Sequence, residues 1–123
     1  MNKKILIVDD DPSFLSWLRF GLEKKNCFQV VTAETMGQGL NLLDSEKPDL
    51  AILDIKLPDG DGFEMCKRIK KGTHPLPVIL VTGVFQESDA YQKGNKVGAD
   101  DLLIKPFSFE QLTLRINRQL VEL

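Results

Sequence analysis

Five short, mainly apolar segments recur along the chain, and each is followed by a stretch with helical signals. The five segments are Ile5–Val8, Phe28–Thr32, Leu50–Leu53, Val78–Val81 and Asp101–Ile104. Short apolar runs bounded by polar and turn residues are typical of strands that are buried on both faces. Strands that alternate with helices predict a doubly wound α/β fold, in which helices cover both faces of a five-stranded parallel sheet.

The segments between these strands carry helix signals. Asp11 can cap a helix that starts at Pro12, and Ser108 with Gln111 forms the pattern of a capping box. The fourth helix is the weakest, because Gly94 lies in its interior and Gly costs about 1 kcal/mol relative to Ala there. The expected helices span about 12–25, 35–46, 62–71, 87–97 and 109–120.

Length and composition narrow the class of protein. The length of 123 residues fits one domain, 1–123. The net charge is −2, so the chain does not have the excess of basic residues that is typical of a nucleic-acid-binding domain. No apolar run approaches the roughly 20 residues of a membrane span, and the N-terminal apolar run is too short for a signal peptide. We therefore expect a cytoplasmic chain without direct contact to nucleic acid or membrane. Cys27 and Cys66 show no metal or redox spacing.

Polar residues stand at the carboxyl ends of four of the predicted strands. Asp9 and Asp10 follow the first strand, Asp54 the third, Thr82 the fourth and Lys105 the fifth. In a doubly wound sheet the carboxyl ends of the strands share one edge, and ligands bind there. We therefore expect these five side chains to meet. Pro58 and two Asp-Gly pairs after Asp54 predict that the chain reverses immediately beyond this edge.

Three carboxylates that meet repel one another, and a hard divalent cation relieves the repulsion. Magnesium prefers oxygen ligands and commonly uses one or two carboxylates together with phosphate oxygens. Asp10 and Asp54 could bind Mg²⁺ directly and Asp9 through a water molecule. No His or Cys lies near these strand ends in the sequence, so the pattern does not favour zinc.

A metal ion, an ammonium and a hydroxyl around one carboxylate suit phosphoryl transfer, which needs positioning and charge neutralisation. Asp54 would be the nucleophile and would form an aspartyl phosphate. Lys105 would pair with the phosphoryl oxygens, and Thr82 would donate a hydrogen bond to one of them.

The chain resembles a receiver domain of the two-component response-regulator family. The matching segments are ILIVDDD, DLAILDIKLPDGDG, VILVTG and GADDLLIKPF, which together span most of the chain. The resemblance implies a flavodoxin-like sheet in the order 2-1-3-4-5 and phosphorylation of Asp54 by a sensor histidine kinase or a histidine phosphotransfer protein. It also implies that the backbone carbonyl of Lys56 is a further magnesium ligand and that the bond before Pro106 is cis. Such a domain catalyses only its own phosphorylation and dephosphorylation.

Leu102 and Gly83 depart from the pattern common in this family, and Val84 flanks the expected path of hydrolytic water. Leu102 stands where similar domains often carry an aromatic switch residue, so the output change would run through backbone shifts. Val84, two residues past Thr82, is apolar and would exclude hydrolytic water, which predicts a long-lived phosphorylated form.

Other functions remain open at this point. A magnesium-dependent phosphatase that forms an aspartyl phosphate would typically carry a second Asp where Lys56 stands, as in haloacid-dehalogenase-like enzymes. A receiver-like interaction module that never takes phosphate is the other alternative. Partners could include an output domain or a separate target protein. The domain could be a monomer or a phosphorylation-linked dimer. Opposite charges near the last helix would permit a dimer without requiring one, namely Asp100, Asp101, Arg115 and Arg118.

Overall fold

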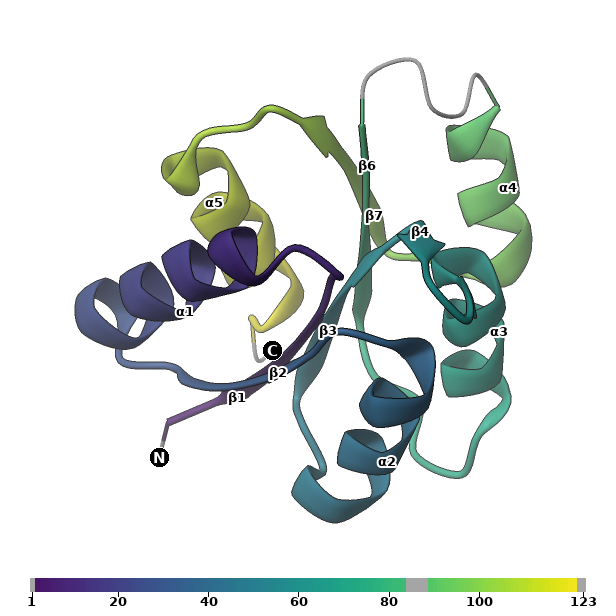
Figure 1. Cartoon of the computed structure of the whole chain (residues 1–123), viewed down its shortest axis with the longest axis horizontal. Helices are drawn as coiled ribbons and strands as arrows, with labels where there is room; N and C mark the ends of the chain where they lie inside the picture. The colour runs from purple at the N-terminus through teal and green to yellow at the C-terminus, as the bar shows by residue number, and fades with distance from the viewer. Residues whose placement is uncertain (1, 84–88, 122–123) are drawn as a thin grey trace.

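A five-stranded parallel sheet forms the centre of the molecule (Figure 1). The computed structural model describes residues 2–83 and 89–121. The strands are β1 (Lys4–Val8), β2 (Gln29–Ala33), β3 (Leu50–Asp54), β6 (Val78–Gly83) and β7 (Asp101–Lys105). Their order across the sheet is β2-β1-β3-β6-β7, which is 2-1-3-4-5 when only the parallel strands are counted. The predicted fold class and strand order are confirmed.

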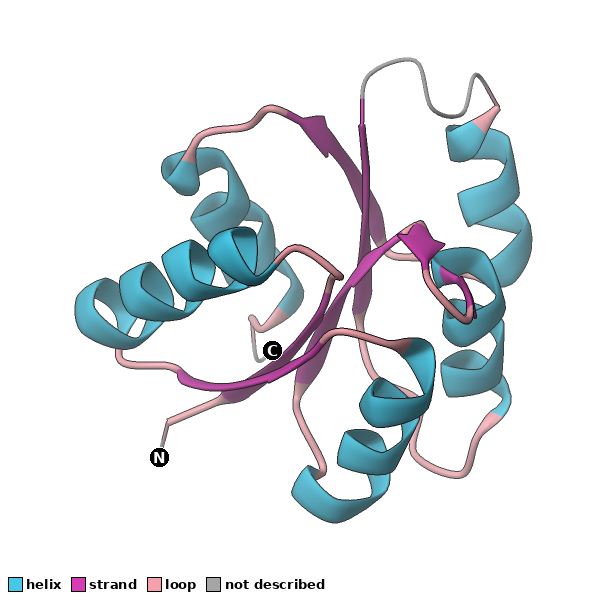
Figure 2. Ribbon diagram, viewed as in Figure 1, coloured by secondary structure: helices cyan, strands magenta, loops and turns pink. Residues whose placement is uncertain are grey.

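Helices cover both faces of this sheet, as Figure 2 shows. They are α1 (Pro12–Asn26), α2 (Met36–Glu46), α3 (Gly62–Lys71), α4 (Ala90–Val97) and α5 (Phe109–Gln119). In Figure 1, α1 and α5 lie on one side of the sheet and α2, α3 and α4 on the other. In the part of the chain that the structure describes, no helix is long and apolar enough to cross a membrane.

The central strand β3 explains why its sequence is an uninterrupted apolar run. Leu50 and Ile52 pack in the cluster on the α1–α5 face, whereas Ala51 and Leu53 pack in the cluster on the α2–α3 face. All five residues of the strand are buried. Full burial of a Leu or Ile side chain stabilises a fold by about 1.5–3 kcal/mol, so β3 holds Asp54 at the end of a rigid element.

Local capping fixes where two helices begin. The carboxylate of Asp11 accepts hydrogen bonds from the backbone N–H groups of Ser13 and Phe14, and Pro12 occupies the first turn. Ser108 and Gln111 form the predicted capping box at the start of α5. The peptide bond between Lys105 and Pro106 is cis, as the resemblance implied.

A short hairpin follows β3 where turn residues predict that the chain reverses. Its strands, β4 (Lys56–Leu57) and β5 (Gly60–Asp61), pair antiparallel. Two-residue strands are too short to leave a periodic pattern, so the sequence indicated the turn but not the pairing. Three parallel strands also extend one or two residues further than predicted and include Asp54, Thr82 and Lys105.

Residues of α4 and α1 differ widely in how deeply they are buried. Gly94 is buried in α4, and a Cβ there would lie 3.6 Å from Leu80 Cδ1, at ordinary van der Waals distance. Trp17 is 47% exposed, although its ring centre lies 6.1 Å from those of Phe14 and Phe109, and Phe20 is 67% exposed.

Candidate functional site

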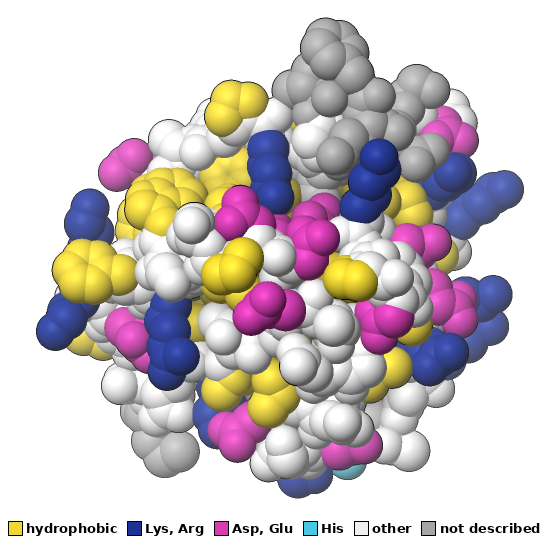
Figure 3. All heavy atoms as spheres, viewed as in Figure 1, with side chains coloured by type: hydrophobic (Ala, Val, Ile, Leu, Met, Phe, Trp, Pro, Cys, Tyr) yellow, Lys and Arg dark blue, Asp and Glu magenta, His cyan; other side chains and the backbone are white. Residues whose placement is uncertain are grey.

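Three carboxylates meet where β1 and β3 end. One carboxylate oxygen from each of Asp9, Asp10 and Asp54 lies within 4.8 Å of the other two. The sheet register produces this meeting, because Val8 pairs with Leu53 and the acids follow directly. Figure 3 shows acidic side chains gathered near the middle of one face, with lysines or arginines beside them.

Two of the three carboxylates in this cluster are buried, which makes their negative charges costly in free energy. Asp9 is 2% exposed and Asp54 is 8% exposed, whereas Asp10 is open to solvent. Burial first, and then the negative charge of Asp9, raises the pKa of Asp54 to about 6, although Lys105 opposes this rise. Close carboxylates of this kind fit a divalent cation that prefers oxygen ligands, such as magnesium.

Lys105 reaches the same cluster from β7. Its ammonium nitrogen Nζ lies 2.9 Å from Asp9 Oδ2 and 3.8 Å from Asp54 Oδ2. The same nitrogen lies 4.1 Å from the centre of the Phe14 ring. The sequence placed Lys105 at this edge but gave no sign of its pairing with Asp9 or of its contact with Phe14. Phe14 shows only a helical apolar spacing in the sequence, and this spacing indicates packing.

Thr82 lies on the strand next to Asp54. Asp54 pairs with Val81 in the sheet register, and the N–H of Ile55 donates to the Val81 carbonyl at 2.9 Å. Thr82 is therefore one residue beyond the partner of Asp54, and it is buried. Its hydroxyl donates to the Gly83 carbonyl at 3.3 Å, so it must turn to reach a group on Asp54.

The β4–β5 hairpin is attached directly to the end of β3. The N–H of Lys56 donates to Asp54 Oδ1 at 3.2 Å, and the N–H of Gly62 donates to the Ile55 carbonyl at 2.8 Å. Asp59, at the tip of the hairpin, accepts two backbone hydrogen bonds from the start of α2. The sequence reasoning treated Asp59 only as a turn residue, and an Asp-Gly pair carries no signal of such a distant partner.

The other residues singled out in the sequence have varied positions. Leu102 is buried in the cluster on the α2–α3 face, with 6% of its surface exposed. Val84 lies outside the described residues. Asp101 pairs with Arg115, and Asp100 pairs with Lys70 at 2.6 Å. These charges are therefore paired within one chain, and the expectation of a dimer stays a prediction.

Comparison with known proteins places the chain in a family. Residues 5–117 match the response regulator receiver domain, and the chain belongs to this family, as the sequence motifs indicated. It is 39% identical over 117 residues to the alkaline phosphatase synthesis transcriptional regulatory protein PhoP of Bacillus subtilis. This match covers 95% of the chain but 48% of PhoP, so the chain spans about half the length of that relative.

Solved structures of receiver domains share the fold. A putative response regulator from Chloroflexus aurantiacus is 30% identical and superposes with a TM-score of 0.91, over 99% of this chain and all (100%) of that one. A CheY-like receiver domain from Methanospirillum hungatei is 34% identical with a TM-score of 0.88, over 96% and 93% of the two chains. The BeF3-activated DrrB receiver domain is 37% identical with a TM-score of 0.86, over 98% of each chain. The chain is accordingly a receiver domain and not a conventional enzyme.

Proposed function

We propose that residues 1–123 form one receiver domain in which Asp54 accepts a phosphoryl group from a histidine kinase or a histidine phosphotransfer protein. The observation that carries this proposal is the meeting of Asp54 with Asp9 and Asp10, within 4.8 Å, and with Lys105 at one open edge of the sheet. A histidine kinase as the partner follows from membership in a two-component family. The description of the similar DrrB domain as BeF3-activated supports the proposal, since BeF3 on a carboxylate resembles an acyl phosphate.

Asp9, Asp10, Asp54 and the backbone carbonyl of Lys56 are the groups that would hold magnesium. When bound, the ion supplies positive charge that neutralises the phosphoryl oxygens. The carboxylate of Asp54 attacks the phosphorus of phosphohistidine, and a new P–O bond forms as the P–N bond breaks. The imidazole, already protonated on its other ring nitrogen, takes the electron pair of the P–N bond and leaves as the neutral base. Lys105 then exchanges its contact with Asp9 for a phosphoryl oxygen, and Thr82 donates its hydroxyl hydrogen to another.

The phosphorylated form would favour one of two surface arrangements that already exchange in the free protein. We propose that Val84 slows the loss of the phosphoryl group and that the output runs through backbone shifts, because Leu102 is a buried aliphatic residue. An output domain or a separate target protein would respond to the change. The receiver domain would act as a monomer or as a phosphorylation-linked dimer.

Intact-mass spectrometry tests the acceptor. The protein is incubated with phosphoramidate and Mg²⁺, and a gain equal to one phosphoryl group is expected. Asp54→Asn should abolish the gain, whereas Asp44→Asn, at an exposed position on α2, should retain it. EDTA should also abolish it. An adduct that persists in Asp54→Asn would exclude Asp54 as the acceptor.

A further inference from the structure

We propose that Asp59 is a positioning residue that clamps the β4–β5 hairpin onto the start of α2 and so holds the Lys56 carbonyl in place to bind magnesium. This inference rests on the proposed function, which assigns the Lys56 carbonyl to the metal. The carboxylate of Asp59 bonds to the start of α2 and not to the three acids of the cluster.

The clamp consists of two hydrogen bonds from one carboxylate. Asp59 Oδ1 accepts from the N–H of Met36 at 2.7 Å, and Asp59 Oδ2 accepts from the N–H of Gly37 at 2.9 Å. These are the first two N–H groups of α2, which have no partner inside the helix. The same two hydrogen bonds lower the pKa of Asp59, with the one from Gly37 contributing most, so the side chain is a carboxylate at neutral pH.

The helix already has an ordinary cap of its own. Thr35 is its N-cap, and the Thr35 hydroxyl accepts a hydrogen bond from the N–H of Gln38 at 3.1 Å. Two different segments of the chain therefore cap one helix start. Thr35 belongs to the loop before α2, whereas Asp59 comes from the hairpin 23 residues beyond Met36. The second cap thus joins α2 to the loop that follows Asp54.

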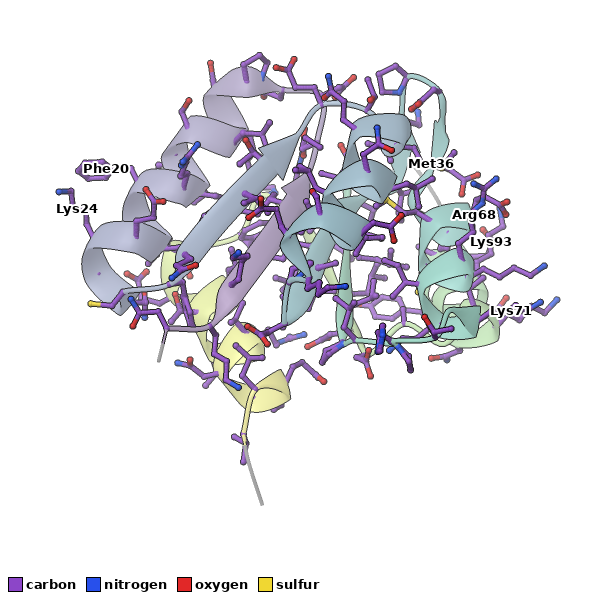
Figure 4. The ribbon with its side chains drawn as sticks, turned by 90° about the horizontal axis from the view of Figure 1, so that it is seen from below. Phe20, Lys24, Met36, Arg68, Lys71 and Lys93 are labelled. Carbon is purple, nitrogen blue, oxygen red and sulfur yellow. The ribbon has the colours of Figure 1, made fainter. Side chains whose placement is uncertain are left out.

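Packing at the tip reinforces the two hydrogen bonds. Met36, labelled in Figure 4, lies at the start of α2, and its side chain covers Gly60. A Cβ on Gly60 would lie 2.7 Å from Met36 Cε and 2.9 Å from Met36 Sδ, closer than real Cβ contacts. The end of the Met36 side chain therefore packs directly on the glycine at the tip of the hairpin.

The hairpin depends on these outer contacts for its position. Only Lys56 with Asp61 and Leu57 with Gly60 pair between its strands, and an isolated two-stranded hairpin is at best marginally stable. Its base is held to β3 by the N–H of Gly62, and its tip is held to α2 by Asp59. Lys56 lies between the two attachments, with its N–H bonded to Asp54 and Leu57 beside it buried in the core cluster, so loss of the tip attachment loosens the peptide that carries its carbonyl.

A calorimetric titration with Mg²⁺ alone tests the inference. Asp59→Ala should raise the Kd of Mg²⁺ about tenfold, at the lower end of the loss that follows removal of a hydrogen-bonding partner around a metal site. Thr35→Ala is the matched control, because it removes the other cap of the same helix and leaves the hairpin attached. Thr35→Ala should lower the Tm as Asp59→Ala does but leave the Kd of Mg²⁺ unchanged.

Hydrogen exchange distinguishes the clamp from a purely capping role, because only the clamp makes the exchange of the α2 amides depend on Mg²⁺. Coupling between two sites is reciprocal, so Mg²⁺ should slow exchange of the Met36 and Gly37 amides in the wild-type protein. In Asp59→Ala these amides should exchange quickly, with or without Mg²⁺. Equal protection of the wild-type amides with and without Mg²⁺ would overturn the inference.

A milder variant covers the case in which Asp59→Ala does not fold. Asp59→Asn keeps one oxygen acceptor for one of the two N–H groups and should raise the Kd of Mg²⁺ by a smaller factor. An unchanged Kd in both Asp59 variants, with wild-type protein that binds Mg²⁺ and accepts the phosphoryl group, would refute the clamp alone. A wild-type protein that neither binds Mg²⁺ nor accepts the phosphoryl group would refute the proposed function instead.

Discussion

The ammonium of Lys105 lies 2.9 Å from Asp9 Oδ2, and this pair joins the last strand of the sheet to the first. Asp9 is 2% exposed, so the contact neutralises a carboxylate that has little access to water. Charged pairs of this kind are costly to break when one partner would be left buried and alone. Lys105 is thus held near Asp54 before any phosphoryl group arrives, and any cation that binds the acids must share them with it.

Lys105→Met should therefore strengthen binding of Mg²⁺ to the unmodified protein. The variant keeps the length of the side chain and removes one positive charge that competes for Asp9 and Asp54. We expect the Kd of Mg²⁺ to fall about tenfold, which corresponds to about 1.4 kcal/mol of removed repulsion. Calorimetric titration measures this change.

Lys24→Met is the control for a general loss of charge. Lys24 lies at the end of α1 far from the strand ends, as its label in Figure 4 shows, and its loss should leave the Kd nearly unchanged. Weaker binding of Mg²⁺ to Lys105→Met than to wild-type protein would show that Lys105 helps to build the site rather than competes with the ion.

The raised pKa of Asp54 predicts how the metal-free protein responds to pH. Burial, and then the charge of Asp9, raises this pKa from 3.8 to about 6, so the folded protein holds the proton more tightly than the unfolded chain does. Stability from this group is therefore present at low pH and is lost as the pH rises from about 4 through about 6. The loss is of the order of 3 kcal/mol at neutral pH.

Urea denaturation in EDTA measures the effect. Asp54→Asn cannot ionise, so it should be more stable than wild-type protein at about pH 8, by up to about 3 kcal/mol, with the difference vanishing near pH 4. Saturating Mg²⁺ should remove most of the difference, because the ion stabilises the charged wild-type site. A wild-type protein in EDTA that gains stability between about pH 4 and pH 7 relative to Asp54→Asn would contradict the sign of the shift.

The sequence predicted the sheet, its helices and the meeting of the acids because each depends on local patterns. Buried strands need apolar runs, and residues that end parallel strands must share an edge. The contacts of Asp59 and Phe14 could not be predicted in this way. Asp59 meets α2 across 23 residues of chain, and Phe14 meets Lys105 across the sheet edge. Such partners depend on loop geometry and side-chain rotamers, which leave no periodic signal.

The contact between Lys105 and Phe14 should make the single tryptophan a reporter of the site. The Phe14 ring lies 6.1 Å from the Trp17 ring, and Lys105 Nζ lies 4.1 Å from the Phe14 ring centre. If Lys105 moves onto a phosphoryl group, this cation–π contact, worth about 0.5–1 kcal/mol at an exposed site, is lost. Addition of phosphoramidate with Mg²⁺ should then change the fluorescence emission of Trp17.

Two variants on the same helix check the route of this signal. Phe14→Leu should abolish the change in emission while mass spectrometry still shows the phosphoryl group. Phe20→Leu should retain the change, because Phe20 is 67% exposed. A full fluorescence response in Phe14→Leu would mean that Trp17 senses the site by another path.

Gly62, the first residue of α3, lies against the backbone at the end of the acceptor strand. A Cβ at this position would lie 2.6 Å from the Asp54 carbonyl oxygen and 3.1 Å from Ile55 Cα, and neither backbone atom can move aside cheaply. Gly62→Ala should therefore reduce the free energy of unfolding by about 1–3 kcal/mol, as overpacking does in well-packed cores. It should also slow phosphorylation, because the end of β3 must shift to admit the methyl group.

Gly72→Ala is the matched control, since a Cβ there would lie 3.4 Å from its nearest neighbours. This variant should change the free energy of unfolding by about 0.5 kcal/mol or less. Urea denaturation and the initial rate of the mass gain measure both effects, and equal losses in the two variants would show that the close approach at Asp54 is not what limits residue 62.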